Sequence, residues 1–460
     1  MSAAQQQPTP LSDNRIEVWC ADRLGTGQVN ITDQVDTDLL VRALNVADIG
    51  TVAVYREKCA PVLPAPTHPA ALTDAVNRGV DRLTVVAQAK QLLDTGAVDS
   101  DPVAFQHAVS TLVSADELAI ADTHCLRAQR RDRPCDDRPW HALTQLLRAR
   151  INAARGELVA ASRDAAEVLA EQGGTGTVPV HWGRQALAQL VTTHVVLGEL
   201  ESARDLLREH PLAGRRSEPA DNAHLLFARA TLHLAEGRPE ESVNDYLECG
   251  RQLTASGVRN PAVLPWRSRA AFAALRVQRR ELAAILAEQE LGDARGWGTP
   301  RAIGTALHPF ALTQQDPDQR LALLGEAVDL LRLSPAGAEL VHARYDLGKA
   351  YCARKDYGRA HRQFHGAMRL AEQCRMTGWT TRASQALAQV NRLRGNVTLT
   401  KQETRIAQLV RAGYNNRQIS EKLYLTRRTV EFHLSGVYRK LGISGRRELH
   451  IALPDEADTL

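Results

Sequence analysis

The sequence predicts a mostly α-helical protein in three parts: a small α+β segment, a solenoid of stacked helix pairs, and a C-terminal domain of four short helices. Three observations predict this fold. Apolar residues recur with a helical period over most of the 460 residues, aromatic residues make up only 4%, and short features repeat about every 40 residues. Few aromatics weigh against a β-sandwich, and a fixed period of this length is typical of repeat architectures.

The first part, residues 1–70, is the least regular. Its first 14 residues are polar and we expect them to be disordered. A helix-like stretch at Asp36–Leu44 and a proline-rich, linker-like end favour either a small α+β module or the remnant of a larger one. The β-prone runs are Arg15–Cys20, Val29–Thr32 and Gly50–Tyr55.

The second part, residues 71–395, reads as one helix after another, and Gly, Pro or Asn usually marks the breaks. The predicted helical stretches are Val80–Asp94, Asp116–Arg131, Pro139–Gln172 with a break at Gly156, His181–His210, Asn222–Ser256, Pro265–Arg295, Arg320–Leu333, Ala338–Arg375 and Trp379–Arg394.

One unit of this part, residues 338–375, carries a characteristic set of small and large residues. Gly348 and Ala360 are expected to admit the backbone of a neighbouring helix, while Tyr351 and Phe364 fill the gaps. Together with Leu347 and Ala367, these four residues resemble the tetratricopeptide pattern, although Glu372 stands where that family has a late proline. The resemblance implies pairs of antiparallel helices that stack on one another.

Weaker copies of this unit share a turn residue followed five positions later by a small residue. Successive small-residue positions lie 37 to 42 residues apart, so we expect about six helix pairs with a concave surface, and one or two more pairs within residues 71–131. The copies are Gly156/Ala161, Gly198/Ala203, Gly237/Ser242, Gln278/Ala283, the position of Arg320, and Lys355/Ala360.

Five tryptophans recur near predicted helix starts. We expect them mainly to pack between repeats, because each ring buries a large area; a groove for a ligand or partner is the alternative. They are Trp140, Trp182, Trp266, Trp297 and Trp379.

The third part, residues 396–460, contains closely spaced helix starts. Thr400 with Glu403 and Asn415 with Gln418 have the spacing of capping boxes, and Thr426 begins a third helix. The turn Tyr424–Thr426 joins two of these helices, which is the arrangement of a helix-turn-helix. Residues 398–453 closely resemble the LuxR-type DNA-binding module. With the repeats they resemble the large ATP-binding LuxR regulators, whose repeats act as a sensor, but without the ATPase domain of those regulators.

The resemblance assigns roles to the third helix. Val430, Leu434, Val437 and Leu441 are expected to point inward, which leaves the family's base-reading positions, Glu431, Phe432 and Ser435, pointing outward. Glu accepts a hydrogen bond from cytosine, and Phe contacts a thymine methyl group. His433 is either a phosphate contact or a structural residue. The expected phosphate contacts are Arg427, Arg428, Thr429, Arg439, Lys440 and Arg446. The final helix, Arg446–Leu453, is the expected dimer contact.

The charge distribution supports a polyanionic partner for this part. The whole chain is +4, but residues 396–453 carry 11 Lys and Arg against 4 Asp and Glu, residues 455–458 are acidic, and the first 395 residues are neutral. We therefore expect the C-terminal domain to bind double-stranded promoter or operator DNA as a homodimer. A repeat-protein scaffold whose last helices bind protein is the alternative.

Several functions are not expected. The sequence contains no phosphate-binding loop of the G-x-x-x-x-G-K-[ST] type, no metal-ligand cluster and no nucleophile elbow, so we expect no cofactor, no metal and no enzymatic activity. Seven scattered cysteines, no secretory signal and no long apolar run favour a cytoplasmic bacterial protein that does not enter a membrane. We expect an effector, either a protein or a small molecule, to act on the repeats.

Overall fold

The structure is a computed structural model, and it describes residues 15–22, 25–32, 52–56, 69–96, 98–130, 138–175, 178–213, 219–395, 399–441, 445–446 and 449. The predicted helix-like stretch 36–44 and the first 14 residues lie outside these ranges. Strand β1 (Arg15–Asp22) pairs antiparallel with β2 (Gly25–Thr32) and with β3 (Val52–Arg56). The predicted β-prone run Arg15–Cys20 lies within β1, the run Val29–Thr32 lies within β2, and the run Gly50–Tyr55 overlaps β3.

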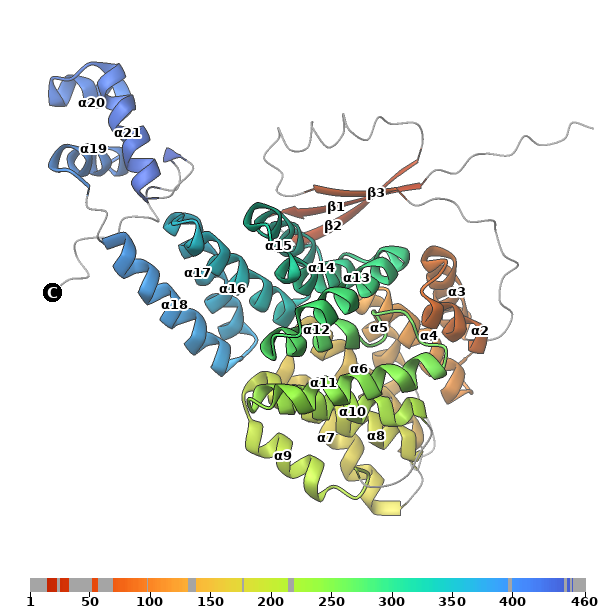
Figure 1. The fold of residues 1–460 in the computed structure, drawn as a ribbon. Coiled ribbons are helices and arrows are strands. Elements are labelled where there is room, and N and C mark those ends of the chain that lie inside the picture. Colours follow the sequence, from red (N-terminus) through yellow and green to blue (C-terminus); the bar gives the residue numbers. More distant parts are fainter. Residues whose placement is uncertain are drawn as a thin grey trace, which may run out of the picture. The chain divides into compact units, whose positions relative to one another are not determined.

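Every other regular element of the described residues is a helix, as the sequence predicted (Figure 1). The helices are α2 (Pro69–Arg78), α3 (Arg82–Asp94), α4 (Pro102–Ser114), α5 (Leu118–Gln129), α6 (Arg138–Arg155), α7 (Leu158–Thr175), α8 (Val180–Leu197), α9 (Leu200–Glu209), α10 (Pro219–Ala235), α11 (Pro239–Ala255), α12 (Trp266–Arg276), α13 (Arg280–Trp297), α14 (Pro300–Thr313), α15 (Pro317–Arg332), α16 (Gly337–Ala353), α17 (Tyr357–Gln373), α18 (Thr377–Gly395), α19 (Lys401–Arg411), α20 (Asn416–Leu423) and α21 (Arg427–Leu441).

The predicted repeat is confirmed at the turns between paired helices. Gly156, Gly198, Gly237, Gln278 and Lys355 all have positive φ angles, between 60° and 92°, which is the left-handed conformation that ends a helix. The small residue five positions after each turn residue is fully buried; these residues are Ala161, Ala203, Ser242, Ala283 and Ala360. Five of the six predicted copies are therefore confirmed. The copy at Arg320, in the pair α14–α15, is not, because Gln315 has no positive φ and Arg320 is only half-buried.

A seventh copy of the feature was missed in the sequence. Asp116 has a φ of 64° and Ala121, five positions later, is fully buried. Ala121 lies 40 residues before Ala161, so the period extends to the pair α4–α5. Helices α2, α4 and α14 also lie outside the predicted helical stretches. The start of α4 has a clear local signal, since Asp101 accepts hydrogen bonds from the backbone N–H groups of Val103 and Ala104, and Pro102 occupies the first position.

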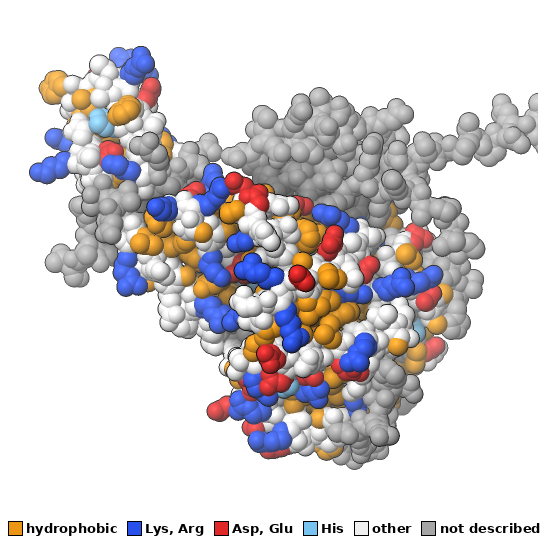
Figure 2. Space-filling view, viewed as in Figure 1, with side chains coloured by type: hydrophobic (Ala, Val, Ile, Leu, Met, Phe, Trp, Pro, Cys, Tyr) orange, Lys and Arg blue, Asp and Glu red, His pale blue; other side chains and the backbone are white. Residues whose placement is uncertain are grey.

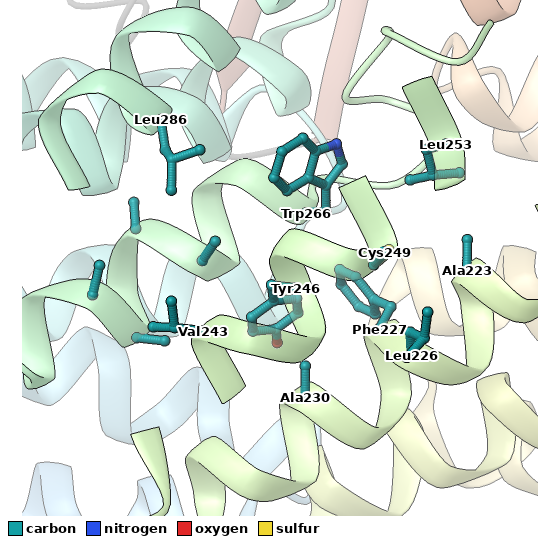
Figure 3. Packing of buried hydrophobic residues seen from close by; sticks show 14 of the residues in the cluster. Ala223, Leu226, Phe227, Ala230, Val243, Tyr246, Cys249, Leu253, Trp266 and Leu286 are labelled. Atoms are coloured by element: carbon teal, nitrogen blue, oxygen red, sulfur yellow. The ribbon is translucent and has the colours of Figure 1, made fainter. Parts of the chain in front are cut away.

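Glycines make room for large rings inside the stack. A Cβ atom on Gly250 of α11 would lie 2.4 Å from the Trp266 ring of α12, and one on Gly348 of α16 would lie 2.7 Å from the Phe364 ring of α17. Gly348 therefore admits a neighbouring ring and not, as predicted, a neighbouring backbone. Figure 3 shows Trp266 beside Tyr246 and Phe227 in the core shared by α10, α11 and α12.

Four of the five tryptophans are at most 8% exposed, and Trp379 is half-buried. The Trp182 indole N–H donates to Gln106 Oε1 on α4 at 2.7 Å, and Trp297 closes α13 instead of beginning a helix. Burial of this extent is what packing between helices requires.

The described helices fall into two compact units. The first comprises residues 1–313 and 326–336, the second residues 314–325 and 337–460. Within the second unit, α16, α17 and α18 share a core of Ala360, Phe364 and Val390. No helix in the described ranges is long and apolar enough to cross a membrane.

The first unit closes on itself through bonds between segments far apart in the sequence. The Trp297 indole N–H donates to the Ser114 carbonyl at 2.8 Å, and Arg301 Nε donates to Asp116 Oδ1 at 2.7 Å. The Asn260 side chain donates to the Val76 carbonyl at 2.8 Å. The early helices α2 to α5 therefore contact the segment that runs from α11 to α14.

Candidate nucleic-acid interface

The C-terminal helices α19 and α20 begin at the two predicted capping boxes. The Thr400 N–H donates to Glu403 Oε2 at 2.7 Å and the Glu403 N–H donates back to Thr400 Oγ1 at 3.3 Å. Asn415 and Gln418 exchange the same two bonds, each at 2.9 Å. Because each box satisfies two backbone groups that a helix start leaves free, both starts are fixed by local sequence.

The turn between α20 and α21 is the predicted Tyr424–Thr426. Tyr424 ends α20 with a φ of 53°, and the Leu425 N–H donates to the Ser420 carbonyl at 2.9 Å. Thr426 caps α21, since its Oγ1 accepts from the Thr429 N–H at 3.1 Å. Gly413, with a φ of 86°, follows α19.

The core of this module orients α21. Val430 and Val437 are fully buried and Leu434 is 3% exposed, and they pack with Ile406 and Ile419 from the other two helices. This stripe leaves the opposite face of α21 in solvent, as its spacing predicted.

The predicted base-reading positions lie on that free face. Glu431 and Ser435 are exposed, and the Phe432 side chain is 75% exposed, with an edge contact to His433 at 5.8 Å between ring centroids. Ser435 Oγ donates to the Glu431 carbonyl of its own helix at 2.9 Å. A large apolar ring in solvent has no role in the module's own packing, so it is available to a partner.

The predicted phosphate contacts divide into two groups. Arg427 and Arg428 are exposed at the start of α21, with Thr429 half-buried between them and the core. Lys440 Nζ instead pairs with Glu403 Oε2 at 2.6 Å, and Arg446 donates to Asn416 Oδ1 at 2.9 Å. The side chain of Arg439, and most of the predicted dimer helix, lie outside the described residues.

The ion pair of Lys440 ties the end of α21 to the start of α19. Burial would raise the pKa of Glu403, but the ammonium group of Lys440 and the hydrogen bonds from Thr400 outweigh it and lower that pKa. Glu403 therefore stays ionised and connects the capping box to α21.

Tyr424 is a candidate interface residue that the sequence reasoning did not single out. It is 96% exposed, and its left-handed backbone conformation is unfavourable for a bulky side chain. Only Leu425 separates it from the exposed segment Thr426–Arg428. An aromatic residue at a turn position that favours Gly or Asn is the signal that points to it.

Figure 2 shows Lys and Arg side chains at several points on the visible face of the module that Figure 1 labels α19 to α21. Three capped helices, an exposed N-terminal half of the third helix and arginines at its start define a helix-turn-helix of the kind that enters a DNA groove.

Comparison with known proteins identifies the module. Residues 397–453 match the family described as bacterial regulatory proteins, luxR family. These residues are a LuxR-type helix-turn-helix domain, as the sequence predicted.

Similar curated proteins match only this end of the chain. An HTH-type transcriptional regulator of Mycobacterium bovis is 41% identical over 64 residues, which are 14% of this chain and 7% of that protein. The oxygen regulatory protein NreC of Staphylococcus aureus is 41% identical over 51 residues, and the transcriptional regulatory protein DegU of Brevibacillus brevis is 38% identical over 50. Each match covers 11% of this chain; the matched part is 24% of NreC and 21% of DegU.

Among solved structures, the chain is similar to a Rap protein complexed with competence and sporulation factor, with a TM-score of 0.48, 13% identity, and coverage of 77% of this chain and 99% of that one. It is also similar to a signal transduction ATPase with a tetratricopeptide repeat sensor from Pyrococcus horikoshii, with a TM-score of 0.41, 14% identity, and coverage of 81% and 51%.

Proposed function

We propose that this protein is a sequence-specific, DNA-binding transcription regulator. The observation that carries the proposal is the LuxR-type domain at residues 397–453, whose third helix leaves its outer face in solvent. The first 395 residues are neutral while residues 396–453 carry the net positive charge, so the attraction to a polyanion is concentrated at the docking module. The protein acts by binding and not by catalysis.

In this proposal α21 lies in the major groove. Glu431, Phe432 and Ser435 read base edges, with Glu431 accepting from a cytosine amino group and Phe432 contacting a thymine methyl group. Arg427, Arg428 and Thr429 contact phosphates from the start of the helix, with Arg439, Lys440 and Arg446 beyond them. Lys440 and Arg446 donate hydrogen bonds to Glu403 and Asn416 within the module. Their contribution to DNA affinity is therefore smaller than that of the exposed Arg427 and Arg428.

The remaining parts of the proposal concern assembly and control. Two copies bind an operator with two half-sites, using the segment Arg446–Leu453 as their contact. The helical repeats receive a protein or small-molecule signal in the cytoplasm. Their support is the size of the repeat body relative to the DNA-binding domain, since stacked repeats offer an extended binding surface.

The proposal is tested by selecting bound fragments from sheared bacterial genomic DNA with the full-length protein and sequencing them. We expect enrichment of a short motif with two similar half-sites. Glu431→Lys is expected to change the base preferred within the half-site, because Lys pairs with guanine and Glu does not. Arg427→Ala is the matched control, since it weakens binding to all fragments alike. Failure to enrich any motif would contradict the proposal and favour the protein-binding scaffold.

A further inference from the structure

Arg150 of α6 is a half-buried cation that has no counter-charge among the described residues. Its Nη1 donates to Ser110 Oγ on α4 at 3.2 Å, and among the described residues this hydroxyl is its one hydrogen-bonding or ion-pairing partner. Burial lowers the pKa of Arg150, which means that the protein destabilises the charge. A half-buried guanidinium is partly desolvated, and such groups are normally paired with a negative charge.

The carboxylates on neighbouring segments are committed to other arginines. Asp116 accepts from Arg301 at 2.7 Å, and Asp122 accepts from Arg155 at 2.8 Å. Among the described residues, neither of these carboxylates pairs with Arg150.

The partner hydroxyl and its neighbour retain unused hydrogen-bonding capacity. Ser110 Oγ accepts from Arg150, and within the described part of the chain its own O–H has no acceptor, so it can donate to a further group. His107, one helical turn earlier on α4, has a buried Nδ1 without a partner in the described part of the chain. His107, Ser110 and Arg150 are all half-buried, so the surface between α4 and α6 is reachable from solvent.

This surface adjoins the bonds that close the first unit. Ser110 lies one turn before Ser114, whose carbonyl accepts from Trp297, and Arg150 lies one turn before Ala154, whose carbonyl accepts from Arg301. A group bound at Arg150 would lie near the contact between the early helices and α13–α14.

We propose that Arg150 and Ser110 bind an oxyanion, a carboxylate or phosphate group of a small molecule. The guanidinium donates from its planar fork to two oxygens of the anion, and the Ser110 hydroxyl donates to one of them. The anion supplies the missing counter-charge. This site rests on the proposed signal-receiving role of the repeats and names the chemistry of the signal.

The test is the thermal unfolding of the full-length protein in sodium phosphate, sodium acetate or sodium chloride at constant ionic strength, without DNA. At least one oxyanion is expected to raise the melting temperature of the wild type saturably, by about 2 to 5 °C relative to chloride. The larger response identifies the group that fits. Arg150→Met is expected to lose this response and to melt no lower than the wild type in chloride, because it removes an unpaired cation.

Arg155→Met is the matched control: it removes a paired arginine of the same helix, lowers the melting temperature and keeps the oxyanion response. Equal responses in the wild type and Arg150→Met, or none in either, overturn the site. So does a large loss of stability in Arg150→Met in chloride, which would make Arg150 structural. DNA binding by both variants, measured separately, distinguishes failure of this site from failure of the proposed regulator.

Discussion

Tyr424 combines two local disadvantages. Its backbone is left-handed and its ring is 96% exposed, so the free protein gains little packing from it and stores about 1 kcal/mol of backbone strain. Its place before Arg427 and Arg428 at the start of α21 fits a contact with the DNA backbone, because a phenol O–H donates to a phosphate oxygen.

Tyr424→Asn is therefore expected to maintain or raise the stability of the protein and to lower its affinity for DNA. Unfolding in urea should show an unchanged or higher free energy of unfolding, by up to about 1 kcal/mol, because Asn tolerates this conformation. Affinity for DNA should fall about 3- to 10-fold, since one charged-acceptor hydrogen bond is lost. A loss of stability together with unchanged DNA affinity would make Tyr424 a structural residue.

The helix-turn-helix shows what local sequence determines. Both capping boxes, the turn at Tyr424 and the inward stripe of α21 were predicted, because each depends on residues within a few positions of one another. The ion pair of Lys440 with Glu403 was not predicted. It joins residues 37 positions apart, and only the fold brings them together.

At the scale of single elements, the repeat depends on close contacts between neighbouring helices. Its turns were predicted from pairs such as Gly198 and Ala203. The contacts of Gly250 and Gly348 with aromatic rings were not predicted, because they depend on side-chain direction.

Gly250→Ala tests this packing. The added methyl group would overlap the Trp266 ring, so we expect a loss of about 1 to 3 kcal/mol in the free energy of unfolding, measured in urea. The matched control is Gly292→Ala in α13, where a Cβ atom meets nothing within 4 Å. There the gain in helix propensity should stabilise the protein by up to about 1 kcal/mol. Similar effects of the two substitutions would contradict the packing.

The N-terminus of helix α12 is capped by a side chain of the next helix, α13. Its preceding residue, Pro265, makes no side-chain cap; instead the fully buried Glu290 of α13 accepts from the N–H groups of Arg267 and Ser268 at 3.0 and 3.1 Å. Burial, only partly offset by these bonds, raises the pKa of Glu290 to about 7.

This shift makes stability depend on pH. Because the folded-state pKa exceeds the unfolded value of 4.5, the folded protein binds more protons between these limits, and its free energy of unfolding falls as pH rises from about 4.5 to about 7. Glu290→Gln cannot ionise. We therefore expect the stability of the wild type relative to this variant to decrease by up to about 3 kcal/mol over that range. If the free energies of unfolding of the two proteins, measured in urea, changed in parallel with pH, the raised pKa of a buried capping carboxyl group would be contradicted.

At the scale of the whole molecule, the bonds that close the first unit could not be predicted from the sequence. Bonds such as Asn260 to Val76 and Arg301 to Asp116 join residues more than 180 positions apart, and no periodic feature predicts them. The separation of a neutral stretch of 395 residues from a basic DNA-binding domain, in contrast, was predictable from charge counts alone.

The central claim is that this basic domain binds duplex DNA through phosphates and base edges. The most direct test is the affinity of the full-length protein for a labelled operator duplex at several salt concentrations. We expect log affinity to fall linearly with log salt, with a slope of about −0.9 for each phosphate contacted, and a shallower slope for Arg427→Ala with Arg428→Ala. Binding that is absent, or that does not change with salt, would contradict the account.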